Sequence, residues 1–290
     1  MKTTQRAKTL AAKKTVKRVR FKKTRPKGIV YYTNPNAIPV RGKYFGLENI
    51  ESLHVHGFAR DPWNRGELHG GNGAIAVGKV KFKGESKAKV VALKGYFRPN
   101  TALENHLKIV VNRLRESQAR HPKMCVLPLT VQGHKNLYLL MEPFFKMQGG
   151  QAVSKMEQTE RVVNKIRLPK DADTLRKVLN ETAELAKVGL AVPQSLAVSR
   201  DLIALGLPQE ALEKMAHKQI DVFNEIKLKN GQTQILSQDI DELLIQNDPK
   251  KAWKKSILNI TEVLHQQNHG QQAQQLIKQL IKETQKQHKL

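Results

Sequence analysis

Cysteine is almost absent from this sequence: Cys125 is the only one in 290 residues, which excludes an internal disulfide framework. No apolar run approaches the roughly 18 residues that are needed to span a bilayer. The N-terminus is basic and lacks the apolar segment of a secretory signal. We therefore expect a cytoplasmic protein that has no transmembrane segment.

Acidic residues are missing from the start of the chain, where none precedes Glu48. Residues 1–28, the basic arm, hold twelve of the 51 lysines and arginines, and the whole chain carries a formal charge of +26. Like charges at this density repel, so we predict that the arm is disordered and binds RNA, DNA or another polyanion through phosphates. Solubility, targeting and attachment to an anionic membrane are the alternatives.

Aromatic residues make up only 5% of the chain, but 39% of it is hydrophobic, which is enough to form a buried core. Alternating apolar residues predict a pair of antiparallel strands within 74–97. Apolar residues at three- and four-residue spacing then predict a helix over 101–117. Two more strands are expected at 124–129 and 137–141, so the first half is rich in strands and has one helix.

The second half has the pattern of a helical region. Residues 144–151 are expected to be a connector, and a strand hairpin is expected around Asn230-Gly231. Helices are predicted over 171–188, over 208–218 and as a pair after residue 250. We therefore predict an α+β fold in three parts: the disordered basic arm (1–28), a β-rich region with one helix (29–145) and a mostly helical region (146–290).

Two glycines and a strand lysine form the most informative pattern. The backbone at Gly71 and Gly73 can approach a ligand closely because it carries no side chain. Lys94 ends the apolar run V91-A92-L93, and a fixed ammonium group of this kind can bind nucleotide phosphates. The alternative is that the glycines only form a turn and that Lys94 is a solvated charge in a lysine-rich chain.

The order of these segments resembles that of the eukaryotic-type protein kinases. Gly71 and Gly73 approximate the glycine-rich loop, although alanine replaces its third glycine, and V91-A92-L93-K94 resembles the V-A-I-K strand. The segment N136-L-Y-L-L-M-E-P143 is similar to the strand that runs into the hinge, with Met141 as gatekeeper and Glu142 as the first hinge residue. The likeness covers residues 68–145 well and residues 171–265 poorly.

The resemblance implies a bilobal kinase-like fold that binds ATP with Mg²⁺. Lys94 would hold the α- and β-phosphates, and its ion-pair partner on the helix would be Glu104, with Glu116 as the alternative. The metal ligands would come from the segment that resembles D-F-G and from an earlier strand: Asp239, Asp241 and Asn224. From the residues alone, the two aspartates could also simply cap a helix N-terminus.

The H-R-D catalytic loop of the kinases is missing from this sequence. Asp221 is a candidate base, as is Asp201, but neither follows a His-Arg pair. The protein could transfer phosphate to a protein hydroxyl, or it could be a pseudokinase that switches a protein partner through nucleotide occupancy. The alternative from another class is a non-enzymatic nucleic-acid- or ribosome-binding protein that uses its basic arm.

Overall fold

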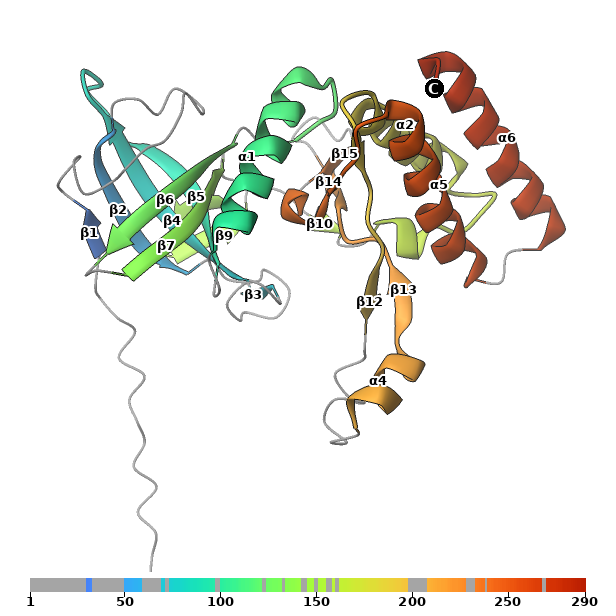
Figure 1. Ribbon diagram of the computed structural model, residues 1–290, viewed down its shortest axis with the longest axis horizontal. Coiled ribbons are helices and arrows are strands. Elements are labelled where there is room, and N and C mark those ends of the chain that lie inside the picture. The colour runs from blue at the N-terminus through green and yellow to red at the C-terminus, as the bar shows by residue number, and fades with distance from the viewer. Residues whose placement is uncertain are drawn as a thin grey trace, which may run out of the picture.

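The computed structural model describes residues 30–32, 50–58, 69–70, 73–96, 100–121, 124–131, 134–141, 145–148, 151–154, 158–159, 162–197, 208–227, 233–237, 239–267 and 270–290. Figure 1 shows a curved sheet at one end, a group of helices at the other and a single helix, α1, between them. The arrangement is a mixed α+β fold with antiparallel sheets, so the predicted fold class is confirmed at this level.

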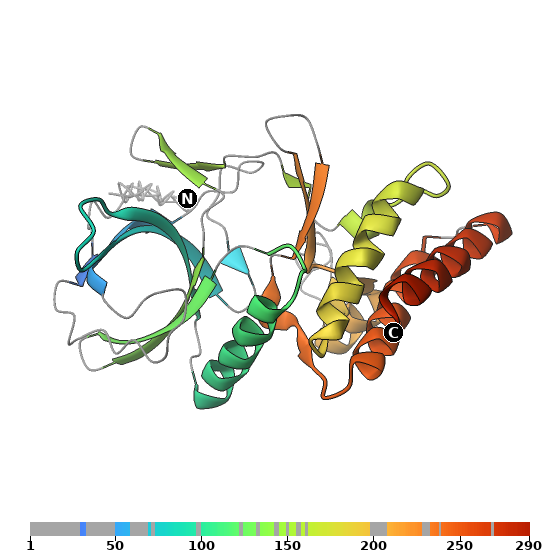
Figure 2. The ribbon, with the colours of Figure 1, turned by 90° about the horizontal axis from the view of Figure 1, so that it is seen from above.

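The first half of the chain forms a seven-stranded antiparallel sheet, which we call the sheet region. Its strand order is β1 (Val30–Tyr32), β2 (Ile50–Phe58), β4 (Gly73–Phe82), β5 (Lys89–Tyr96), β7 (His134–Met141) and β6 (Met124–Val131), and the short β3 (His69–Gly70) also pairs with β4. The predicted pair of strands within 74–97 is β4 and β5, joined through Gly84, which has a positive φ of 82°. Figure 2 shows how strongly this sheet curves.

The sheet buries side chains on both faces. One set consists of Leu53, Val80, Phe82, Val91, Leu93 and Leu140. Residues on the other face include Ala92, Leu139 and Met141, which belong to the large core that continues into the helices. Because side chains alternate along a strand, Lys94 lies on the same face as Ala92 and so points toward that core.

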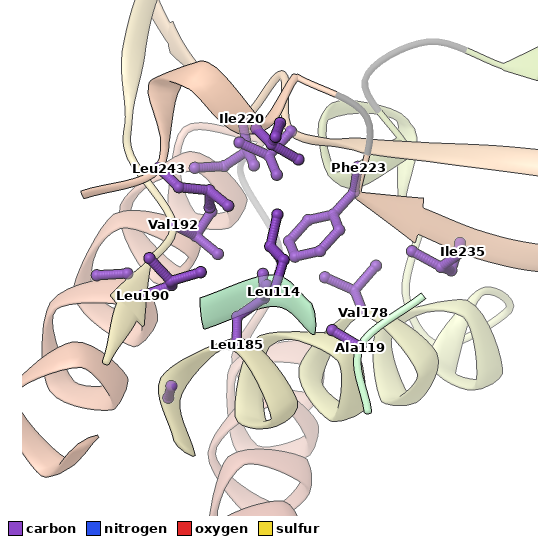
Figure 3. Close-up of a cluster of buried hydrophobic side chains, with 14 of the residues drawn as sticks. Leu114, Ala119, Val178, Leu185, Leu190, Val192, Ile220, Phe223, Ile235 and Leu243 are labelled. Atoms are coloured by element: carbon purple, nitrogen blue, oxygen red, sulfur yellow. The ribbon is translucent and has the colours of Figure 1, made fainter. Parts of the chain in front are cut away.

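Helix α1 (Thr101–Glu116) packs on the sheet through its apolar stripe. Asn100 caps it, since its side chain accepts a hydrogen bond of 2.8 Å from the backbone N–H of Leu103. Leu107, Val110, Val111 and Leu114 are fully buried. Leu114 reaches the core of the helical end, as Figure 3 shows, so α1 joins the two halves of the molecule.

The helical region comprises residues 162–290. Its main helices are α2 (Ala172–Lys187), α5 (Pro249–His265) and α6 (Gln271–His288), preceded by a short 3-10 helix, η2 (Val162–Lys165). A small sheet lies beside them, in the order β10 (Gln158–Thr159), β14 (Phe223–Lys227) and β15 (Thr233–Ser237). Two residues of β11 (Leu190–Ala191) pair with β16 (Leu244–Ile245), and the 3-10 turn η3 (Ile240–Glu242) lies just before β16.

A projecting hairpin leaves the body between β11 and β14, as Figure 1 shows. Its strands are β12 (Ser195–Ala197) and β13 (His217–Gln219), and α4 (Gln209–Met215) precedes β13. The helix predicted over 208–218 is therefore shorter than expected and gives way to a strand. The predicted connector at 144–151 is corrected too: it contains most of a second hairpin, formed by β8 (Phe145–Gln148) and β9 (Gln151–Ser154).

The predicted hairpin around Asn230-Gly231 has its strands in β14 and β15, but the turn itself lies outside the described residues. The basic arm also lies outside them. Within the part that the structure describes, no helix combines the length and apolarity needed to cross a membrane.

Candidate functional site

Strand β5 positions Lys94 at the boundary between the sheet region and the helical region. Its neighbours across the sheet are Ile75 on β4 and Leu139 on β7. Leu139 is fully buried, and the Lys94 side chain is only 10% exposed. Lys94 is therefore not the solvated surface charge that its lysine-rich context allows.

The partner of Lys94 is an acidic turn, which we define as residues 239–242. The turn lies just beyond β15, where the backbone N–H of Ser237 donates to the carbonyl oxygen of Arg120 at 2.8 Å. The Lys94 Nζ lies 2.6 Å from Asp241 Oδ1 and 3.5 Å from Asp239 Oδ1. Residues almost 150 positions apart in the chain therefore meet as an ion pair.

The turn carries more negative charge than Lys94 can neutralise. Burial acts to lower the pKa of Lys94, but the carboxylates of Asp239 and Asp241 outweigh it and hold that pKa above its usual value. The same two carboxylates attract Lys94 but repel Glu242, which is itself an acid. Burial, followed by repulsion from the same two carboxylates, raises the pKa of Glu242 to about 7. Excess carboxylate charge of this kind favours the approach of a cation.

Helix α1 contributes a histidine rather than a glutamate to this junction. His106 Nε2 lies 3.2 Å from the backbone carbonyl oxygen of Asp241, within hydrogen-bonding distance. Glu104, which we expected to pair with Lys94, instead accepts a hydrogen bond from Lys108 one turn further along the same helix. This i, i+4 contact is the ordinary local one for a helix, so the expected Glu104–Lys94 ion pair is corrected. No contact with Lys94 is found for the alternative, Glu116, which is exposed at the end of α1.

Tyr96 encloses the ion pair from the same strand. Its ring centroid lies 5.9 Å from Lys94 Nζ, within the range of a cation–π contact, and the residue is 6% exposed. Burial, and after it the negative charges of Asp241 and Asp239, raises the pKa of the Tyr96 phenol. A hydrogen-bonding interaction with the Asp241 carboxylate adds to this rise, although among the described residues the buried hydroxyl has no partner of ordinary hydrogen-bond geometry. A buried hydroxyl in this state is a group that a ligand could satisfy.

Asp221 and Asn224 lie on the helical side of the junction. Asp221 Oδ2 accepts hydrogen bonds from Ser195 Oγ at 2.8 Å and from Gln219 Nε2 at 2.6 Å, which fixes this carboxylate at the base of the projecting hairpin. Its negative charge is the smallest of the causes that raise the pKa of Glu242. Asn224 is buried on β14, where it pairs in register with Leu236 of β15.

Gly73, the glycine of the pattern that the structure describes, lies at the end of the sheet where Lys94 lies. Gly73 starts β4 and pairs with both Gly70 and Tyr96, two strand positions beyond the Ile75–Lys94 pair. Gly71 is outside the described residues, as is Glu142. Met141 is buried at the end of β7, where it pairs in register with Ala92 and Met124.

Metal ligation remains a prediction for this site. Within the described ranges, no group of three or more His, Cys, Asp or Glu side chains is placed to hold an ion on its own. Mg²⁺ is commonly bound in proteins by one or two carboxylates together with phosphate oxygens and water, so the oxygen ligands of the acidic turn fit this mode.

Sequence reasoning identified Lys94, Asp239 and Asp241, which the structure brings together, but it missed three other residues. His106 and Tyr96 contact the pair, and Ser195 fixes Asp221. Tyr96 carried a usable signal, because it follows Lys94 by two residues and so shares its face of the strand. Among known proteins, no family model matches this sequence and no curated protein does.

Proposed function

We propose that this protein is a kinase-like nucleotide-binding protein that binds ATP with Mg²⁺ at Lys94 and the acidic turn, between the sheet region and the helical region. The observation that carries this proposal is the contact of a buried strand lysine with two aspartates contributed by a distant turn. An isolated ion pair would need one carboxylate. The second aspartate and the raised pKa of Glu242 indicate negative charge beyond what Lys94 neutralises, which a ligand's cation could use.

In this proposal the residues have distinct roles. Lys94 contacts the α- and β-phosphates, and the backbone at Gly73 approaches them from the neighbouring strand. Ala92 and Met141, which pair across β5 and β7, line the side on which the base would stack. Asp239 and Asn224 supply oxygen ligands to the cation, which when bound neutralises phosphate charge. Glu142 and Gly71 keep the hinge and loop roles that the resemblance implies.

Two versions of the function differ in whether phosphate is transferred. Transfer to a protein hydroxyl needs a group that orients the nucleophile, and Asp221 is the candidate. Its Oδ2 already accepts two hydrogen bonds, so it is a well-fixed acceptor, but it lacks the His-Arg context of an active kinase. A pseudokinase that signals nucleotide occupancy to a protein partner requires only the binding site.

The test is ATP binding by the full chain with and without Mg²⁺, measured by isothermal titration calorimetry. We expect Lys94→Met to weaken binding by about tenfold or more, because a charge-assisted contact with phosphate is lost. Lys89→Met is the matched control: Lys89 lies on the same strand but its side chain is 60% exposed and pairs locally with Glu85. Equal affinity in all three proteins, or none in any of them, rejects the proposal.

A folding control is needed because Lys94→Met leaves the buried Asp241 carboxylate without its cation. The double variant Lys94→Met/Asp241→Asn removes both members of the shorter ion pair. It should fold as well as the native protein and still fail to bind ATP. A double variant that folds and binds ATP normally would contradict the assignment of Lys94.

The second candidate function is binding of RNA or another nucleic acid through the basic arm, and it is favoured by the twelve unopposed positive charges of residues 1–28. Affinity for a single-stranded RNA should fall steeply with salt for the full chain. A chain starting at Gly28 should bind more weakly and with a shallower salt dependence. A flat salt response, or no loss on truncation, counts against this function, and neither result affects the ATP site.

A further inference from the structure

The two aspartates of the acidic turn are in unlike surroundings. The side chain of Asp241 is 4% exposed and its Oδ1 lies 2.6 Å from Lys94 Nζ. The side chain of Asp239 is 41% exposed and its Oδ1 lies 3.5 Å from the same nitrogen, at the outer limit of a hydrogen bond. The shorter, buried contact therefore belongs to Asp241, and the carboxylate that solvent ions can reach belongs to Asp239.

Asp241 is also fixed through its backbone. Its carbonyl oxygen is within 3.2 Å of His106 Nε2 on α1, so the turn is tied to the helix at the residue that holds Lys94. Tyr96 covers the ammonium group on another side, with its ring centroid 5.9 Å away. Lys94 and Asp241 therefore lie in an enclosure formed by β5, α1 and the acidic turn.

Burial makes the Lys94–Asp241 pair costly to break. A buried ammonium group that loses its carboxylate is left uncompensated in a medium of low dielectric constant, whereas a partly exposed carboxylate can exchange its partner for water at a smaller cost. Asp241 is therefore committed to Lys94. If Asp239 releases Lys94, the ammonium group still has a carboxylate partner, because Asp241 remains.

We propose, on the basis of the ATP-binding function above, that the two aspartates of the acidic turn have different roles. Asp241 is the positioning residue that holds the Lys94 ammonium group in place for phosphates, the task that a helix glutamate would otherwise perform. Asp239 alone of the two binds the cation. The sequence predicted that both aspartates are metal ligands, and this proposal keeps only Asp239 in that role.

The first experiment measures the affinity for ATP with Mg²⁺ and with EDTA, in the native chain and in two variants. Asp239→Asn should bind ATP in EDTA within about twofold of native but lose most of the gain that Mg²⁺ provides, about tenfold. Asp241→Asn should lose about tenfold in both conditions, because Lys94 is displaced. Asp173→Asn is the matched control, since Asp173 forms an exposed ion pair with Lys177 on α2.

The reverse pattern overturns the inference. If Asp241→Asn loses only the Mg²⁺-dependent part, Asp241 is a cation ligand. If Asp239→Asn and Asp241→Asn lose the same amount of ATP affinity in both conditions, the two aspartates do not have different roles.

A second measurement needs no nucleotide and so separates failure of this inference from failure of the proposed function. The rate at which an amine-acylating reagent modifies Lys94 is followed by mass spectrometry. Asp241→Asn should raise that rate several-fold, because the shorter contact that fixes the amine is lost, whereas Asp239→Asn should leave it near the native rate. Native protein that binds no ATP but shows this labelling pattern rejects the function and keeps the role of Asp241. Equal labelling in both variants rejects that role.

Should Asp241→Asn fail to fold, the paired variant decides the matter. Adding Lys94→Met to Asp241→Asn removes the stranded ammonium group and should restore the native melting temperature to within a few degrees. Failure of Lys94→Met to rescue the fold would show that Asp241 acts on something other than Lys94.

Discussion

Helix α1 meets the helical region at two junctions, and they are built on different principles. At the first, His106 and Lys94 meet the acidic turn, where the carboxylates outnumber the ammonium group. At the second, Arg113 Nη1 donates to the backbone carbonyl oxygens of Gly189 at 2.7 Å and Gln246 at 2.6 Å. The acceptors at the Arg113 junction are neutral, and the atoms around Gly189 leave no room for an added Cβ atom.

The difference shows which junction is available for a ligand. At the Arg113 junction the guanidinium holds the end of α1 against the two short strands β11 and β16, and its Nη1 donates to two backbone carbonyl oxygens. At the Lys94 junction two aspartates face one ammonium group, and the Asp239 carboxylate is partly exposed. In contacts that serve only the fold, polar groups are paired with one another, whereas binding sites retain polar or charged groups that a ligand can pair with.

The Arg113 junction should be the more sensitive of the two to added volume. Gly189 has a positive φ of 70°, and a Cβ atom there would lie 2.4 Å from the Gln246 carbonyl oxygen and 2.6 Å from Arg113 Nη1. Gly189→Ala should therefore cost about 4 kcal/mol in the free energy of unfolding, measured with urea. Gly84→Ala is the control: its φ is 82° but nothing lies within 4 Å, so about 1 kcal/mol is expected. Similar losses for both would show that the junction yields easily.

The Lys94 junction should respond to loss of charge instead. Asp241→Asn should cost about 3 kcal/mol in the free energy of unfolding, because Lys94 would keep only its longer contact. Asp239→Asn should cost less than about 1 kcal/mol, since its side chain is partly exposed. Denaturant titrations of the two variants side by side measure the difference. A larger loss for Asp239→Asn would reverse the roles given to the two carboxylates.

A pH dependence should distinguish the Lys94 junction from the Arg113 junction. The pKa of Glu242 is about 7 in the folded protein and near 4.5 when the chain is unfolded. Between these values the folded state binds the extra proton, so the contribution of Glu242 to stability falls as pH rises from 4.5 to 7 and levels off above. Glu242→Gln should remove this fall and make the protein relatively more stable at pH 8. If the pH profile of the melting temperature is the same in Glu242→Gln as in the native protein, Glu242 does not cause the fall in stability.

The smallest effect is expected at ion pairs that belong to neither junction. Lys177 Nζ lies 2.9 Å from Asp173 Oδ2 one turn away on α2, with side chains 42% and 71% exposed. Lys177→Ala should change the free energy of unfolding by less than about 0.5 kcal/mol, and added salt should erase the change. A larger value would mean that exposed pairs matter here as much as the buried one, and would weaken the contrast between the junctions.

The sequence predicted those elements that have long periodic patterns. Helices α1 and α2 and strands β4 and β5 fall within one or two residues of their expected limits, because each buries a continuous stripe that leaves its period in the sequence. The two-residue pairing of β11 with β16 has no such period. It exists because Gly189 and Gln246 are brought together by tertiary packing.

The candidate site was predictable in its residue types but not in its pairing. Lys94 and the two aspartates stood out by their positions after apolar strands, yet nothing local indicates that residues 94 and 241 form the closest contact. The mistaken choice of Glu104 was avoidable, because Lys108 four residues later offers it a partner on the same helix face. The role of His106 depends on the angle at which α1 meets the acidic turn, which no sequence pattern encodes.

The projecting hairpin has a consequence for how this protein can vary. Ser195 pairs in register with Gln219, so the chain departs from the body and returns at points about 5 Å apart. Both residues also donate hydrogen bonds to Asp221, so the anchor of the hairpin is shared with the candidate base. The residues between Ser195 and Gln219 can therefore be lengthened, shortened or replaced while these two anchors keep their positions. It offers protein engineers an insertion point for a recognition peptide beside Asp221.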